Sequence, residues 1–186
     1  MSLTQVDWSR LPRPVDDGAA AHLPGLALPD VTLPATGGGA VDLGALRGLS
    51  VLYLYPMTGR PDRDLPDGWD MIPGARGCTP QSCAYRDLHA DLLGLGVDHL
   101  FGVSTQDTAW QDEAAQRLHL PYPLLSDAEG ALRAALDLPV QIVDGMTLLK
   151  RLTLIARDGV IAKAIYPVFP PDQDAGRIRD WLHTQR

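Results

Sequence analysis

Apolar and polar positions alternate along most of the chain in patterns that separate short strands from helices. Residues 1–28 are the exception, because they contain three prolines and show only weak periodicity. We expect them to form an N-terminal arm that runs over the surface of a domain formed by residues 29–186. In that domain, apolar runs bounded by Gly or Pro predict strands, and apolar residues spaced three and four apart predict helices.

These signals predict strands that alternate with helices, followed by a hairpin and a last helix. The predicted strands cover residues 31–33, 41–43, 49–55, 100–104, 123–125, 152–155 and 160–165. The predicted helices run from Cys78 past Leu95, over 107–118, over 127–136, and from Pro171 or Asp172 to the C-terminus. Strands that alternate with helices pair in parallel, whereas the hairpin around Asp158-Gly159 adds antiparallel strands. We therefore expect an α/β, thioredoxin-like fold with a mixed central sheet flanked by helices on both faces.

One segment breaks this alternation, a loop over residues 57–77 that is inserted between a predicted strand and the first long helix. Gly, Pro and charged residues recur every few positions in it. Loops of more than about 15 residues inside a compact domain are usually functional or disordered, and this loop leads directly to both cysteines. We expect its charged part to lie outside and its apolar end, with Trp69, to pack over the first cysteine.

Composition and charge narrow the possible classes of function. The chain is 45% hydrophobic and 21% charged, which is usual for a globular protein, and its net charge is −7. An acidic chain without a polybasic run is a poor partner for nucleic acid or for an anionic membrane. Its longest apolar run is far shorter than the roughly 20 residues of a membrane-spanning helix, and no signal-peptide pattern opens it. We expect a cytoplasmic protein in which the two cysteines serve redox chemistry.

The candidate chemistry concentrates in residues 77–83, Gly-Cys-Thr-Pro-Gln-Ser-Cys, where a helix is predicted to begin. A cysteine in the first turn of a helix lies near unpaired backbone N–H groups and the positive end of the helix dipole. Both stabilise the thiolate, which is the nucleophilic form of the side chain. Cys78 is therefore placed to react, and an inert buried cysteine is the alternative.

Three other uses of the cysteines remain open. A zinc site built from Cys78, Cys83 and His89 lacks the fourth ligand and the short spacing of a closed site. A thioredoxin-type disulfide exchanger needs two residues between its cysteines, and four are present here. A redox-sensing interaction module would carry the same motif on the same fold without catalysing a reaction. The spacing disfavours the first two, whereas the third differs only in activity.

Four further segments are informative when taken together, namely residues 52–56, 73–87, 101–104 and 120–127. They resemble the peroxiredoxins, in particular the peroxiredoxin Q or bacterioferritin comigratory protein branch. The resemblance implies a thiol-dependent peroxidase that reduces hydrogen peroxide or organic hydroperoxides. It implies that Cys78 is the peroxidatic cysteine, that Cys83 is the resolving cysteine that forms an intramolecular disulfide with it, and that Arg151 holds the thiolate and the peroxide.

The same resemblance implies what such a cycle needs. A hydroperoxide is the substrate, and a thioredoxin- or glutaredoxin-like protein reduces the disulfide. The chemistry requires no cofactor and no metal, and the protein is a monomer or a homodimer. If the chain consumes no peroxide, it is instead a thiol-disulfide exchanger or a redox-sensing module.

The chain departs from the family pattern just before the reactive cysteine. Ala75 stands where the family usually has the threonine that contacts peroxide, and Met71 stands where it usually has a proline. We expect Thr58 or Thr79 to supply the missing hydroxyl and Pro73 to shield the site. The expected substrate-binding residues are therefore Thr58, Pro73, Gly77 and Thr79.

Helix geometry constrains the two cysteines. Residues five apart in a regular α-helix have Cα atoms roughly 8.7 Å apart. A disulfide needs Cα atoms within about 7 Å of each other. If Cys78 and Cys83 form a disulfide, the helix must therefore unwind locally, and we expect this around residues 77–84.

Overall fold

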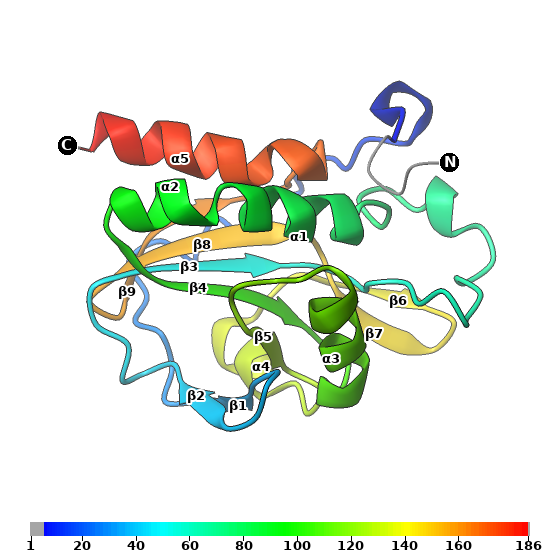
Figure 1. Cartoon of the computed structure of the whole chain (residues 1–186). Coiled ribbons are helices and arrows are strands. Elements are labelled where there is room, and N and C mark those ends of the chain that lie inside the picture. The colour runs from blue at the N-terminus through cyan, green and yellow to red at the C-terminus, as the bar shows by residue number, and fades with distance from the viewer. Residues whose placement is uncertain (1–5, 186) are drawn as a thin grey trace.

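The computed structural model describes residues 6–185, and its centre is a five-stranded mixed sheet (Figure 1). The five strands are β3 (Leu49–Leu54), β4 (Val97–Ser104), β5 (Leu124–Ser126), β8 (Leu152–Arg157) and β9 (Val160–Ile165). Their order across the sheet is β5-β4-β3-β8-β9. The pairs β3–β4 and β4–β5 are parallel, whereas β3–β8 and β8–β9 are antiparallel. The mixed sheet expected from the sequence is confirmed.

Helices cover the two faces of the sheet unequally (Figure 1). One face carries α1 (Cys78–Asp87), α2 (His89–Gly94) and α5 (Asp174–Thr184). The other side carries α4 (Ala131–Leu136) and the small sheet of β1 (Thr32–Pro34) and β2 (Ala40–Asp42), while α3 (Thr108–Arg117) packs beside β5. The described residues also form three single-turn 3-10 helices, η1 (Trp8–Arg10), η2 (Trp69–Met71) and η3 (Pro171–Gln173). This is the thioredoxin-like arrangement predicted above.

β3 is the central strand of the five, and all six of its residues are buried because both faces of the sheet are covered there. Its side chains alternate between the faces. Leu52 and Leu54 join the core that contains α4, whereas Val51 and Tyr53 join the core beneath α1 and α5. A strand that is buried on both faces has a continuous apolar sequence, which is the pattern that predicts it.

Three elements differ from the prediction, and the simplest difference is that α4 begins at Ala131 instead of Asp127. The helix expected from Cys78 past Leu95 is divided into α1 and α2, because the backbone at Leu88 leaves helical geometry (φ −98°, ψ 7°). A second hairpin, β6 (Val140–Val143) and β7 (Met146–Leu149), is absent from the predicted elements. Its turn is Asp144-Gly145, the same type of pair that marks the β8–β9 hairpin, so the local signal for it was present in the sequence.

Most described residues of the N-terminal segment lie at the surface, as expected of an arm, but Ala20, Leu23 and Leu28 anchor it in the core. Leu23 is fully buried in the cluster that contains α4. Residues 25–28 run along β9, where the N–H of Gly25 donates to the carbonyl of Ile161 (2.7 Å). This pairing covers an edge of the sheet that would otherwise expose unpaired backbone groups. Residues 1–5 of the expected arm lie outside the described residues.

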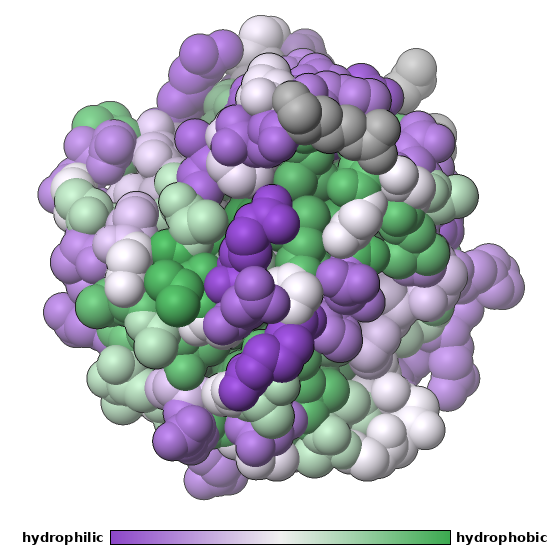
Figure 2. Space-filling model, turned by 90° about the vertical axis from the view of Figure 1, so that its left-hand side faces the viewer, coloured by the Kyte–Doolittle hydropathy of each residue, from purple (hydrophilic) through white to green (hydrophobic). Residues whose placement is uncertain are grey.

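The surface of the described residues mixes apolar and polar groups. Figure 2 shows one end of the molecule, where apolar residues form separate groups with charged and polar residues between them. The larger apolar side chains with substantial exposure are Val15, Leu26, Met71, Leu93, Ile142, Met146 and Val160. Scattered apolar residues of this kind are usual on a globular protein. No helix within residues 6–185 has both the length and the apolar character needed to cross a membrane.

The burial of the N-terminal segment predicts that it stabilises the domain. Leu23→Ala removes a fully buried side chain, and we expect the free energy of unfolding to fall by about 2–5 kcal/mol. Leu26→Ala is the matched control, because Leu26 is 39% exposed and its truncation should cost less than about 1 kcal/mol. Urea unfolding followed by far-UV circular dichroism measures both changes. Equal losses in the two variants would contradict the core position of Leu23.

Candidate active site

Cys78 is the first residue of α1 and directly follows the inserted loop. Its side chain is buried, with 3% of its surface exposed. Gly77 is the N-cap residue, and no side chain accepts a hydrogen bond from the first turn there. The backbone N–H groups of that turn are therefore available to stabilise negative charge at the start of the helix.

Gly77 is required by its backbone conformation and by the space around it. Its φ of 111° lies in the left-handed region, which other residues rarely adopt. A Cβ atom at this position would lie 2.7 Å from Cγ of Pro171 and 2.7 Å from Cη2 of Trp8. The indole N–H of Trp8 in turn donates to Asp172 (2.8 Å). Segments around Trp8, Gly77 and Pro171, which are distant in sequence, thus meet at the start of α1. This close packing explains why position 77, one of the predicted site residues, is a glycine.

Arg151 lies between β7 and β8, and its guanidinium reaches Cys78. Its Nη2 is 3.2 Å from Sγ of Cys78 and donates to the carbonyls of Ala75 (3.1 Å) and Gly74 (3.2 Å). The side chain is only 2% exposed. A buried guanidinium at this distance places a fixed positive charge and a hydrogen-bond donor beside the sulfur. The structure therefore brings together Cys78 and Arg151, which the sequence analysis paired through a resemblance.

Gln81 also contacts the guanidinium, although it is not among the predicted site residues. It is fully buried one turn after Cys78, and its Oε1 accepts a hydrogen bond from Nη1 of Arg151. Its Nε2 donates to Asp174, the first residue of α5 (2.8 Å). Gln is seldom fully buried, so a Gln on the inner face of the predicted helix is the signal that could have indicated it.

Two buried tyrosines hold the middle of α1. The hydroxyl of Tyr53 donates to Oγ of Ser82 (3.0 Å), and that of Tyr122 donates to the carbonyl of Ser82 (2.8 Å). Burial raises the pKa of both tyrosines well above the usual value, so both remain protonated donors. The ring of Tyr53 also stacks on that of Tyr85, with centroids 4.4 Å apart. Ser82 is thus fixed at a position between the two cysteines.

Cys83 is the second thiol of α1, and both cysteines are free. Five positions along an α-helix correspond to a rotation of roughly 140°, so the two side chains leave the helix on different faces. Burial raises the pKa of the Cys83 thiol, and the nearby guanidinium of Arg86 acts in the opposite direction. At neutral pH, Cys83 is therefore a protonated thiol held away from Cys78.

Cys78 lines a pocket of about 290 Å³ whose apolar walls include Met57, Leu65 and Trp69. Trp69 is buried and packs against Met57, as expected for the apolar end of the inserted loop, whereas Met71 is exposed. The pocket is also lined by Arg60, Arg63, Arg76 and Arg117. Three of these arginines are paired with acidic side chains, so the entrance is polar without a large excess of charge.

The structure separates the other predicted substrate-binding residues. Thr79 lines the same pocket as the reactive cysteine. Thr58 is fully buried, and its hydroxyl donates to Oε1 of Gln106 (3.1 Å), so it faces the end of β4 instead of that pocket. Pro73 lines a different cavity, of about 210 Å³, which Arg151 also lines. Of the two expected threonines, only Thr79 lines the pocket that contains Cys78.

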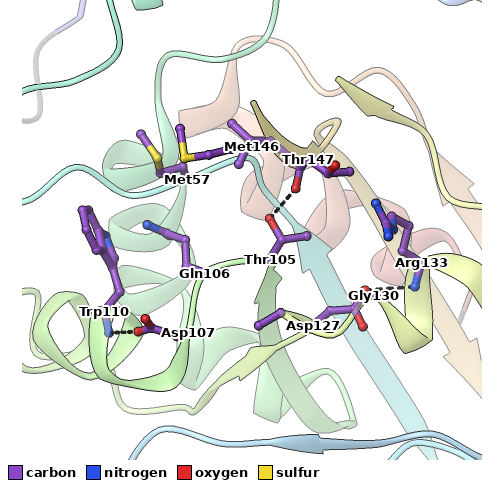
Figure 3. A pocket seen from close by; sticks show the side chains of 12 residues that line it. Met57, Thr105, Gln106, Asp107, Trp110, Asp127, Gly130, Arg133, Met146 and Thr147 are labelled. Atoms are coloured by element: carbon purple, nitrogen blue, oxygen red, sulfur yellow. Dashed lines mark hydrogen bonds between the residues drawn. The ribbon is translucent and has the colours of Figure 1, made fainter. Parts of the chain in front are cut away.

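A larger cavity of about 430 Å³ adjoins the reactive pocket, since Met57 lines both. It lies beyond the carboxyl ends of β4 and β5 and is covered by the β6–β7 hairpin. Figure 3 shows Met57 and Met146 at one end of this cavity, and Trp110 and Arg133 on opposite sides of it. Neither cysteine lines it.

Fold and site together define a thioredoxin-fold protein with a free thiol at a helix start and a buried arginine beside it. Both cysteines lie in α1, and the guanidinium belongs to Arg151, between β7 and β8. Within residues 6–185, no three His, Cys, Asp or Glu side chains lie close enough to hold a metal ion.

The chain belongs to the redoxin family, whose model matches residues 23–179. A curated relative is the chloroplastic peroxiredoxin Q of rice (Oryza sativa subsp. japonica), which is 30% identical over 154 residues. The match covers 82% of this chain and 63% of the rice protein, so the chain spans less than two thirds of that relative. The resemblance to peroxiredoxins of the Q type is confirmed.

Solved structures agree with this assignment. Peroxidoxin BcpB from Mycobacterium tuberculosis superimposes with a TM-score of 0.70 at 26% identity, over 88% of this chain and 97% of that chain. Peroxiredoxin Q from Xanthomonas campestris superimposes with a TM-score of 0.68 at 23% identity, over 86% of this chain and 96% of that chain. The second similarity shows a common fold.

The constraints on Gly77 predict a costly substitution. Gly77→Ala should lower the free energy of unfolding by about 2 kcal/mol or more, because it combines backbone strain with two close contacts. Gly176→Ala in α5 is the control, since that glycine has ordinary φ and open space, and the change should stabilise the helix by up to about 1 kcal/mol. Urea unfolding tests both. An unchanged free energy of unfolding in Gly77→Ala would contradict the packing described at the start of α1.

The raised pKa of Cys83 predicts slow alkylation at neutral pH. In the Cys78→Ser protein, only Cys83 can react with iodoacetamide, and its rate should rise only at pH above the ordinary thiol value of about 8.5. The same protein unfolded in urea is the control and should titrate near that ordinary value. Mass spectrometry of timed samples gives both profiles. A folded-state midpoint at or below the unfolded one would contradict the burial argument.

Proposed function

We propose that the protein is a cytoplasmic thiol-dependent peroxidase that uses Cys78 as its nucleophile. The observation that carries this proposal is the guanidinium of Arg151, 3.2 Å from the Cys78 sulfur at the start of α1. The thiolate attacks the terminal oxygen of a hydroperoxide, an S–O bond forms, and the O–O bond breaks. The alkoxide leaves and takes up a proton to become an alcohol, or water when the substrate is hydrogen peroxide. Cys78 becomes a sulfenic acid.

The geometry suits this step in two ways. The negative charge moves from sulfur to the leaving oxygen, so a fixed cation and oriented N–H groups nearby stabilise the transition state. Arg151 is held by three backbone carbonyls and Gln81, so its position costs no reorganisation during the reaction. The hydroxyl of Thr79 is a further donor at the pocket and takes the place of the threonine that the chain lacks at position 75.

Cys83 supports a second step. Its thiol attacks the sulfenic sulfur of Cys78, a disulfide forms, and water leaves. Because both residues lie in one regular helix, α1 must first unwind over part of residues 77–84. A thioredoxin- or glutaredoxin-like dithiol protein then reduces the disulfide and restores both thiols.

The pocket supports organic hydroperoxides as substrates beside hydrogen peroxide. A volume of about 290 Å³ exceeds what hydrogen peroxide fills, and Met57, Leu65 and Trp69 offer apolar contact to an organic group. Burial of such a group should lower KM for a larger hydroperoxide relative to hydrogen peroxide.

Cysteine variants test the proposed roles. Cys78→Ser should abolish consumption of hydrogen peroxide and cumene hydroperoxide, because it removes the nucleophile. Cys83→Ser should still react once, and dimedone should trap the sulfenic acid on Cys78. Intact mass should show the loss of two hydrogens in the wild type after one equivalent of peroxide. The measurements are peroxide consumption and mass spectrometry of the alkylated products.

Two outcomes would decide against the proposal. If the Cys78→Ser protein reacts with peroxide and the Cys83→Ser protein does not, the roles of the two cysteines are reversed. A reduced wild type that consumes no peroxide, yet exchanges disulfides with a thioredoxin, would favour a thiol-disulfide exchanger or a redox-sensing module.

A further inference from the structure

Asp174 is a buried carboxylate that none of the steps above uses. It is the first residue of α5 and has no solvent exposure. One of its oxygens, Oδ2, accepts three hydrogen bonds, from Gln81 Nε2 (2.8 Å), the hydroxyl of Tyr85 (2.8 Å) and the hydroxyl of Thr153 (2.7 Å). A single oxygen atom therefore joins α1, β8 and α5.

Two of these donors come from α1, on which Gln81 and Tyr85 are four residues apart. Side chains at this spacing lie on one face of a helix. Their face is the one turned toward α5, so Asp174 contacts α1 over one full turn, beginning three residues after Cys78. Loss of the carboxylate would leave two buried donors of α1 without an acceptor, which is costly in a protein interior.

Asp174 also determines how Gln81 faces Arg151. An ionised carboxylate only accepts hydrogen bonds, so the amide of Gln81 must turn its NH₂ group toward Asp174. Its carbonyl oxygen then points the other way and accepts from Nη1 of Arg151. The reverse orientation would place NH₂ against the guanidinium, donor against donor. The orientation of one amide thus links the carboxylate to the group beside the Cys78 sulfur.

The second oxygen of Asp174, Oδ1, is buried without a hydrogen-bond partner within the described residues. Burial raises the pKa of Asp174, while the hydrogen bonds from Thr153, Gln81 and Tyr85 act in the opposite direction. A proton on Oδ1 would leave all three bonds at Oδ2 in place. An asparagine can mimic this arrangement, with its NH₂ at the position of Oδ1, so the hydrogen bonds and the charge can be tested separately.

We propose that Asp174 is a positioning residue of the active site, which fixes the amide of Gln81 and thereby holds the guanidinium of Arg151 against Cys78. The proposal rests on the peroxidase function proposed above. Asp174 touches neither the peroxide nor the sulfur; it acts through Gln81. The same bonds hold α1 in the helical state that the reduced enzyme needs.

The test compares Asp174→Leu, which removes the acceptor, with Asp174→Asn, which keeps an acceptor oxygen and removes the charge. We expect Asp174→Leu to lower the second-order rate constant of Cys78 oxidation by hydrogen peroxide at least tenfold. Asp174→Asn should retain the rate within about threefold of the wild type, because the three bonds can persist. Stopped-flow fluorescence on reduced protein measures the rate, and circular dichroism checks the fold. Equal losses in both variants would overturn the positioning role.

A second readout separates positioning from a general loss of structure. Alkylation of Cys78 by iodoacetamide involves no leaving oxygen, so it depends less on Arg151 than the peroxide reaction does. In Asp174→Leu, the peroxide rate should therefore fall at least tenfold more than the alkylation rate. If Asp174→Leu does not fold, Gln81→Met tests the same link, because it removes the amide and leaves Asp174 its bonds to Tyr85 and Thr153. If Gln81→Met is oxidised by hydrogen peroxide with the rate constant of the wild type, the proposal is overturned.

A crystal structure of reduced Asp174→Leu, or of Gln81→Met if that variant replaces it, gives a readout independent of peroxidase activity. We expect the guanidinium of Arg151 to move out of hydrogen-bond distance from the Cys78 sulfur. An unmoved guanidinium would overturn the positioning role even if the wild type is a peroxidase. A displaced guanidinium in a chain whose wild type consumes no peroxide would instead overturn the proposed function and support the positioning role.

Discussion

The arrangement of the reactive end of the molecule depends on one buried cation, the guanidinium of Arg151. A guanidinium with 2% exposure needs hydrogen-bond acceptors from the protein, because burying an unpaired charge is costly. It finds them in the carbonyls of residues 74–76 and in the side chain of Gln81. These acceptors lie on both sides of Gly77, so the hydrogen bonds of the two terminal nitrogens also fix the end of the inserted loop, the start of α1 and the position of the Cys78 sulfur, while Nε is buried without a partner among the described residues.

The contacts that stabilise α1 oppose the movement that a disulfide would require. Hydrogen bonds from Tyr53 and Tyr122 reach Ser82, and Asp174 receives them from Gln81 and Tyr85. The α1 residues that make these hydrogen bonds lie between the two cysteines or shortly after Cys83. The helix start is held by the hydrogen bonds of Arg151 and lies against Trp8 and Pro171. A disulfide between the two cysteines would therefore require contacts at both ends of this segment to break.

The inserted loop and the β6–β7 hairpin support each other. Met57, Trp69 and Ala75 from the loop pack with Val143 and Leu148 from the hairpin in a small core of their own. This packing orders a segment whose sequence, rich in Gly, Pro and charge, would not hold a conformation by itself. It also provides the apolar wall of the pocket at Cys78. The departure from the family pattern before the reactive cysteine is therefore built into the fold.

The sequence by itself predicted the strands of the central sheet, most of the helices and the position of Cys78 at a helix start, because apolar runs, apolar stripes and helix-start signals are local patterns. Its resemblance to a family added Arg151. The tertiary structure decided the rest: that Gln81 and Asp174, 93 residues apart, meet beside Arg151, that Thr58 is bound to Gln106 and not to the pocket, and that Leu23 belongs to the core. Periodicity tells which face of an element is buried. It does not tell which distant side chain that face will contact, since that follows only from how the helices pack on the sheet.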